Sequence, residues 1–248
     1  MNENSIKKNE FFRVMENKLG KDVFRKTNKM FVSGIICTDV IYSHSYQDVR
    51  YYEGTLKVQR ISGIDDFIKF SISEDVLTSV DFAFPTGKFV KMAGYCRSYN
   101  SVVEGNRHLE LKLVVKHIEI CEKEDECINM VYLMGTLCRD AIIRKTPYGK
   151  IITELFLAVN NSRWVTYFVP CIVWNESAES VAKLKKGDKI RICGNFQSRT
   201  YQKLISEEKG LYKERMVNEI SVFYINRSNF DWNKKGRIAS LFLFYIVV

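Results

Sequence analysis

The chain has 248 residues, 46% hydrophobic and 27% charged, which suits one large or two ordinary globular domains and excludes an intrinsically disordered chain. With 3 prolines and 13 glycines it has no room for a low-complexity linker, so any domains abut closely. The net charge of +9 suggests a polyanionic partner and falls mainly in residues 126–248, which hold 19 Lys and Arg against 11 Asp and Glu, whereas residues 1–125 hold 19 against 18.

The cysteines give no sign of a cross-linked or metal-bound fold. There are 7, an odd number, and they are scattered with no C-x-x-C pair and no signal peptide at the start. The 3 histidines also lack metal-ligand spacing to one another. We therefore expect free thiols, no metal or other cofactor, and a cytoplasmic protein.

Residues 1–29 are predicted to form an N-terminal arm with a short amphipathic helix. Phe11, Met15, Leu19 and Val23 recur at helical spacing with basic residues between them. The apolar face is narrow, which favours docking onto the neighbouring domain over lying on a membrane surface.

Two strand-rich segments follow, at residues 30–121 and 129–225, separated by an acidic linker at 122–128. Alternating apolar residues and turn signals predict strands at 30–37, 51–60, 67–73, 88–97 and 109–120 in the first segment. In the second they predict strands at 130–137, 151–159, 167–174, 188–200 and 213–225, with a helix at 175–184. Five strands with a helix after the third is the order of an OB-fold, a small Greek-key barrel.

The two segments can be overlaid at an offset of 100 residues. Leu56 then meets Phe156, Phe67 meets Tyr167, and the pair Gly87 and Gly94 meets Gly187 and Gly194. This favours a tandem duplication, and the fold class is mostly β with two tandem five-stranded barrels. In this overlay Phe168 corresponds to Ile68 and Trp174 corresponds to Glu74. If the register shifts by one residue, Trp174 corresponds to Ser73 instead. The first copy is therefore expected to be a degenerate barrel with auxiliary or assembly contacts.

The stretch Arg163–Asn175 carries the side chains best suited to bind the polyanionic partner that the net positive charge suggests. Read as a strand, it puts Phe168, Pro170, Ile172 and Trp174 on one face and Val169, Cys171 and Val173 on the other. The second face suits a barrel interior. The two rings of the first face lie six residues apart, roughly 20 Å at ~3.3 Å per residue. Such rings either stack on the bases of a single-stranded nucleic acid or are simply buried in a core.

Residues 129–225 resemble the bacterial single-stranded DNA-binding protein family. The blocks that carry the resemblance occur in family order: residues 129–140, 144–150, 156–160, 168–174, 178–182, 185–188 and 194–201. The last block, Gly194-Asn195-Phe196-Gln197-Ser198-Arg199-Thr200-Tyr201, is similar to the family's Gly-x-Leu-x-Thr-Arg-x-Tyr/Trp. The first segment resembles the family only through the internal repeat.

The resemblance implies a site in which aromatic side chains stack on bases and cations contact phosphates. The implied stacking residues are Phe168, Trp174, Tyr201 and, at the start of the same stretch, Trp164. The implied phosphate contacts are Arg144, Lys145, Lys150, Arg163, Arg199 and Lys203. The family also implies a nucleoid-associated binder of single-stranded DNA in replication, recombination or repair, with a dimer of tandem chains supplying four barrels.

The chain departs from the family pattern at its C-terminal tail, residues 226–248. Members of the family usually end in an acidic tail that recruits replication and repair proteins, whereas this tail ends in the apolar run 238–248. Eleven residues are too short for a membrane helix, which needs ~20. An added strand, a partner-docking segment and an aberrant terminus all remain open.

Two other functions compete with single-strand binding. An OB-fold nuclease would need converging carboxylates to hold a cation, and Asp140 and Glu154 near the proposed face are isolated in the sequence. An assembly or primosome-type protein would bind other proteins mainly and nucleic acid weakly. The sequence favours a non-catalytic binder of single-stranded DNA.

Overall fold

The computed structural model describes residues 28–60, 62–80, 86–103, 105–121, 127–146, 149–160, 165–206 and 211–227, with only the backbone described at 103, 106, 176, 200–206, 211–216 and 227. The predicted helix near residues 11–23 and the apolar run 238–248 lie outside these ranges.

The first half of the chain forms the five predicted strands and adds two short elements. The predicted strands are β1 (Asn28–Ile36), β3 (Val49–Gln59), β4 (Asp65–Ser73), β5 (Phe89–Val103) and β6 (Asn106–Cys121). The additional elements are the helix α2 (Glu74–Thr78) and the strand β2 (Ile41–Tyr46). Every residue of β2 is exposed, so its sequence lacks the alternation that reveals a half-buried strand.

The second half repeats this arrangement. Its predicted strands are β7 (Asn129–Leu137), β9 (Ile151–Asn160), β10 (Thr166–Trp174), β11 (Lys189–Ser206) and β12 (Leu211–Arg227). The strand β8 (Ile142–Lys145) was not predicted. The predicted helix at 175–184 is α3 (Asn175–Val181), which ends three residues early because Leu184 turns inward, where its carbonyl accepts a hydrogen bond from the Ala141 N–H.

All the strands of the described residues belong to one sheet of 12, in the order β2-β3-β4-β6-β5-β1-β7-β11-β12-β10-β9-β8. The second six strands repeat the first six in reverse order. Each half closes into a barrel through one more pairing, β1 with β3 and β7 with β9, and each contains one parallel pair, β4 with β6 and β10 with β12. The predicted fold of two tandem OB barrels is confirmed.

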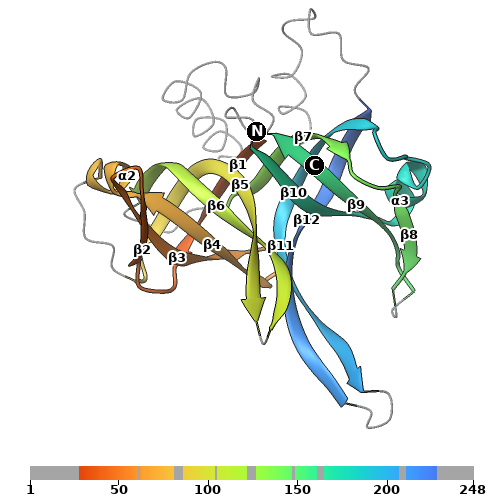
Figure 1. Ribbon diagram of the computed structural model, residues 1–248, viewed down its shortest axis with the longest axis horizontal. Coiled ribbons are helices and arrows are strands. Elements are labelled where there is room, and N and C mark those ends of the chain that lie inside the picture. The colour runs from red at the N-terminus through yellow and green to blue at the C-terminus, as the bar shows by residue number, and fades with distance from the viewer. Residues whose placement is uncertain are drawn as a thin grey trace, which may run out of the picture.

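The two barrels are joined side by side through their first strands. The antiparallel pairing of β1 with β7 runs from Asn28 opposite Leu133 to Val32 opposite Asn129. Figure 1 shows the halves on either side of this pair, with α2 and α3 at opposite ends and the β11–β12 hairpin projecting from the middle. Buried apolar side chains from both barrels form one continuous cluster, so the barrels share their stabilising contacts.

A buried carboxylate ties the second barrel to the first. The Asp66 side chain on β4 is 1% exposed and accepts hydrogen bonds from Arg60 and from the backbone N–H and hydroxyl of Ser198 on β11. Arg60 also donates to the Ser198 carbonyl at 3.0 Å. The hydrogen bonds that Arg60 donates to Asp66 raise the pKa of the Arg60 guanidinium, so the guanidinium remains charged. Asp66 therefore fixes the base of the β11–β12 hairpin against the neighbouring barrel.

Replacing Asp66 with alanine should destabilise the fold. The change leaves the Arg60 guanidinium and the Ser198 N–H without their partner, and breaking a buried ion pair on one side costs roughly 3 kcal/mol. Urea unfolding of the full chain measures the loss. Asp65→Ala is the matched control because Asp65 is half-buried and its ion pair with Lys57 is long, at 3.8 Å. A loss below 1 kcal/mol for Asp66→Ala, or equal losses for the two variants, would contradict the proposed role.

Candidate nucleic-acid interface

The strand β10 divides its side chains between a core and an outer face. Val169, Cys171 and Val173 are at most 1% exposed and belong to the core cluster, whereas Phe168 is 44% exposed. This is the division that the alternation predicts. Ile172 differs, because it lies on the outer face yet is only 4% exposed, so neighbouring side chains cover it.

Two rings lie next to each other on the outer face. The ring of Phe168 stacks in parallel with that of Phe156 on β9, with 6.0 Å between centroids and 13° between planes. At the other end of β10, Trp174 is half-buried and its indole N–H donates to the Ser221 hydroxyl on β12 at 3.1 Å. The contact fixes the indole while leaving part of it exposed.

The sequence reasoning did not include two rings of this surface, Phe156 and Phe223. Phe156 is the outward residue between the buried Leu155 and Leu157, an alternation that is readable in the sequence. Phe223 on β12 is 49% exposed and follows Val222, which pairs with Val173 next to Trp174. The bulge at this point of β12 exposes Phe223. No pattern in the sequence predicted this bulge.

The predicted cations of this barrel fall into two groups. Arg144 and Arg199 are held by carboxylates: Arg144 Nε lies 3.1 Å from Glu154, and Arg199 makes a bidentate pair with the buried Glu219 at 3.1 and 3.2 Å. Lys145 on β8 and Lys150 after it are exposed, and the described residues give neither an ion pair.

Four of the predicted site residues have side chains outside the described part of the structure. Trp164 and Arg163 lie outside it entirely. Tyr201 and Lys203 belong to β11 by their backbone, with Tyr201 opposite Arg215 and Lys203 opposite Lys213 on the projecting hairpin.

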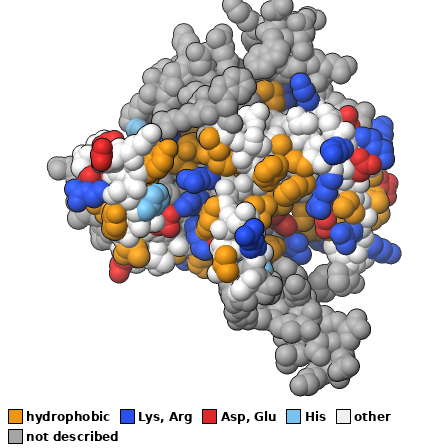
Figure 2. Space-filling view, in the orientation of Figure 1, with side chains coloured by type: hydrophobic (Ala, Val, Ile, Leu, Met, Phe, Trp, Pro, Cys, Tyr) orange, Lys and Arg blue, Asp and Glu red, His pale blue; other side chains and the backbone are white. Residues whose placement is uncertain are grey.

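The surface of the second barrel mixes apolar and basic groups. Figure 2 shows hydrophobic and basic side chains interspersed with a few acidic ones over β8, β9 and β10. Arg139 contributes to the mixture, since its guanidinium lies 5.2 Å from the centroid of the Phe156 ring. Such a surface can stack on flat, electron-rich groups and attract anions.

The first barrel carries a ring that the overlay at 100 residues missed. In the parallel pairs, Ile72 lies opposite Val115 and Val173 opposite Val222, and each valine directly precedes the bulged residue of its strand. Strands β4 and β10 are therefore related by an offset of 101. The expectation that Ile68 replaces Phe168 in the first barrel is wrong, because Phe67, 39% exposed, occupies that position.

The rest of the first barrel's outer face is less suited to an anion. Ser73 takes the position of Trp174 at the offset of 101, and two lysines of this face are paired with carboxylates. Lys69 lies 2.6 Å from Glu110, and Lys112 lies 2.6 Å from Glu53. Burial alone would raise the pKa of Glu110, but hydrogen bonds led by that from Lys69 outweigh it and lower the pKa, which keeps the carboxylate charged.

Neither a metal centre nor a spanning helix is found in the described parts of the chain. No group of three or more His, Cys, Asp or Glu side chains there could hold a metal ion. Among the same residues, no helix is long and apolar enough to cross a membrane.

Comparison with known proteins places this chain among single-strand binding proteins. Residues 128–223 match the model of the "Single-strand binding protein family". Single-stranded DNA-binding protein 2 of Listeria monocytogenes is 33% identical over 109 residues, which are 41% of this chain and 67% of that protein. The chain belongs to the single-strand binding protein family.

Another family member shares a smaller part of its length with this chain. Single-stranded DNA-binding protein 1 of Lactococcus lactis is 39% identical over 82 residues, which are 30% of this chain and 55% of that protein. The chain thus spans about half the length of that relative.

A solved structure reproduces the fold of both barrels. The wild-type single-stranded DNA binding protein from Thermus aquaticus superposes with a TM-score of 0.65 at 20% identity, covering 84% of this chain and 96% of that one. One barrel alone cannot supply that share of the chain. The tandem arrangement is therefore a fold that this chain shares with the Thermus structure.

Proposed function

We propose that this protein binds single-stranded DNA without sequence preference and without catalysis, in replication, recombination or repair. The observation that carries the proposal is the placement of Phe168. Its ring faces outward beside Phe156, while its neighbours on β10 fill the core. An exposed ring on a rigid strand is a platform on which a base can stack, and every base offers a π-face.

The charges of the second barrel complete the proposed site. Arg144, Lys145 and Lys150 lie on or beside β8, the edge strand next to β9, which in turn pairs with β10. We propose that they contact phosphates, together with Arg199, Lys203 and Arg163, and that Trp174, Tyr201 and Trp164 add further stacking. Stacking on base faces and contacts to phosphates hardly distinguish one base from another. The proposed binding therefore has no sequence preference.

The comparisons support this function. The relatives from Listeria and Lactococcus are both named as single-stranded DNA-binding proteins. The family match covers the second barrel, where the exposed Phe168 ring and the exposed Lys145 and Lys150 lie. We propose that residues 129–225 form the main binding domain, residues 30–121 an auxiliary barrel, and that the protein works without a cofactor on DNA in the cytoplasm.

Removing the two outward rings of β10 should weaken binding strongly. One stacked base contributes about 1–3 kcal/mol, so the Phe168→Ala, Trp174→Ala double variant should lose roughly 2–4 kcal/mol, or about 30- to 700-fold in Kd. Anisotropy of a labelled oligo-dT measures the Kd of the full-length variant and wild type in the same salt.

Ile143→Ala is the matched control for this experiment. Ile143 on β8 is 50% exposed, so the change removes an equally accessible apolar group but no ring. It should leave the Kd within about twofold of wild type, as surface substitutions usually do. Equal Kd values for the double variant and wild type would contradict the proposal. They would favour an assembly or primosome-type protein that binds other proteins mainly.

We further propose that two chains associate, so that four barrels form the working unit. The proposal rests on the common assembly of single-barrel family members as tetramers, which two tandem chains would match. Size-exclusion chromatography with light scattering should give about twice the chain mass of 29.0 kDa. A chain mass that stays at the monomer value across micromolar concentrations would contradict it.

A further inference from the structure

A carboxylate lies inside the proposed binding surface, where a negative charge opposes the DNA backbone. The Glu154 side chain on β9 is 28% exposed, and one of its oxygens lies 3.1 Å from Arg144 Nε. The other lies 3.9 Å from a guanidinium nitrogen of Arg139. One acid thus holds two of the arginines that face the proposed path of the DNA.

Glu154 is central to the surface by its place in the sheet. It pairs with Ile142 on β8 and with Ile172 on β10, so it lies between the strand that carries Arg144 and the strand that carries Phe168. Phe156 is the next outward residue on β9, and Arg139 lies over its ring. A strand stacked on these rings would bring its phosphates close to the Glu154 carboxylate.

The first barrel has a glutamate at the equivalent position. At the offset of 101 residues, Glu53 on β3 is the counterpart of Glu154, because Tyr52 pairs with Ile72 as Thr153 pairs with Val173. Glu53 holds the Lys112 ammonium at 2.6 Å, and that ammonium lies 4.8 Å from the Tyr99 ring centroid. Each barrel therefore has a glutamate that engages a cation next to an outward ring.

We propose that Glu154 occupies the place of a phosphate in the free protein and competes with DNA for Arg144 and Arg139. This rests on the function proposed above and adds a regulation of the same site. Arg144, Arg139 and Glu154 together carry one net positive charge instead of two. When DNA binds, phosphates replace the Glu154 carboxylate as partners of the two arginines. The net gain in binding free energy is smaller because the existing ion pairs must first be broken.

The exchange has a consequence for salt dependence. Each cation that neutralises a phosphate of a single strand adds about 0.7 to the slope of log K against log salt, because a counterion is released. An arginine already neutralised by Glu154 adds less to this slope. The competing carboxylate therefore lowers both the affinity and its sensitivity to salt, and it favours release of the strand.

The test compares full-length wild type with Glu154→Gln, Arg144→Gln and the double variant, using labelled oligo-dT over a series of KCl concentrations. Glutamine keeps the shape of Glu154 and removes its charge. We expect Glu154→Gln to bind roughly 2- to 5-fold tighter at low salt, the range set by an exposed ion pair, with a slope steeper by about 0.7. In the Arg144→Gln background the gain should shrink.

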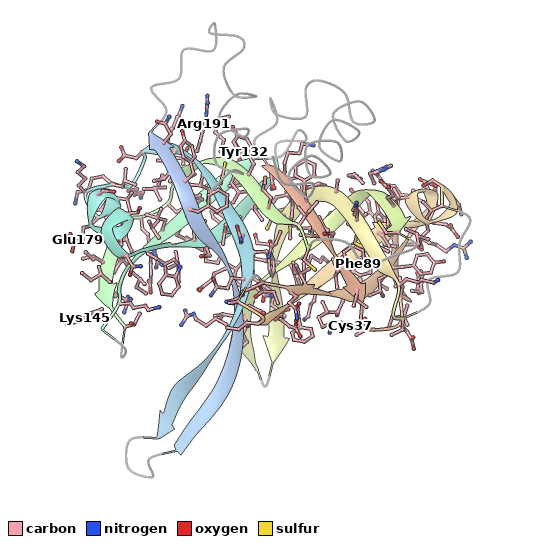
Figure 3. All side chains as sticks on the ribbon, turned by 180° about the vertical axis from the view of Figure 1, so that it is seen from behind. Cys37, Phe89, Tyr132, Lys145, Glu179 and Arg191 are labelled. Atoms are coloured by element: carbon pink, nitrogen blue, oxygen red, sulfur yellow. The ribbon has the colours of Figure 1, made fainter. Side chains whose placement is uncertain are left out.

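Glu179→Gln is the control for net charge, because it makes the same change on the exposed face of α3 (Figure 3). It should leave Kd within twofold and the slope unchanged. Weaker binding by Glu154→Gln would overturn the inference and show that Glu154 only positions the arginines. An unchanged slope, or a gain equal to that of Glu179→Gln, would also overturn it. Failure of wild type itself to bind oligo-dT would instead refute the proposed function.

Discussion

The alternation of side chains along β10 is the constraint on which the proposed binding surface depends. Val169, Cys171 and Val173 fill the core, and Phe168 can face outward only while they do. A slip of one residue would bury the ring and expose the aliphatic side chains, so the register must be strongly fixed. Pairing with β9 on one side and β12 on the other fixes it along the strand.

The neighbouring barrel supports the same strand at its start. The Phe168 N–H donates to the Ser98 hydroxyl on β5 at 2.9 Å, and in the counterpart contact the Phe67 N–H donates to the Ser198 hydroxyl at 3.2 Å. Each barrel thus satisfies a backbone donor at the outward ring of the other. Asp66 adds a buried ion pair to one of these contacts, so the outer faces of both barrels belong to one rigid arrangement.

Periodicity in the sequence was enough to predict the ten main strands and the tandem fold. Apolar residues with a period of two mark strands that have one buried face, and nearly all of these strands do. It could not reveal β2, whose residues are all exposed, or β8, which has only four residues. The helix α2 is also short, with five residues and no side-chain cap to mark its start.

The details of the site depend on register, which the sequence does not encode directly. The overlay at 100 residues was right for Gly94 and Gly194, which take equivalent places on β5 and β11, but β4 and β10 differ by 101. One residue in a connecting loop therefore hid the correspondence between Phe67 and Phe168. The ion pairs of Glu154 and Glu219 with arginines were hidden for the same reason, because each joins residues of different strands.

The Phe168 ring is exposed to a ligand, whereas Arg144 and Arg199 already have carboxylate partners. Photo-crosslinking of oligo-dT to the full chain, followed by peptide mapping, tests most directly whether the outward rings of β10 meet bases. We expect adducts on Phe168 or Trp174 within residues 164–183. Adducts confined to the first barrel or to residues 228–248, with 164–183 unmodified at saturating DNA, would contradict the proposed surface.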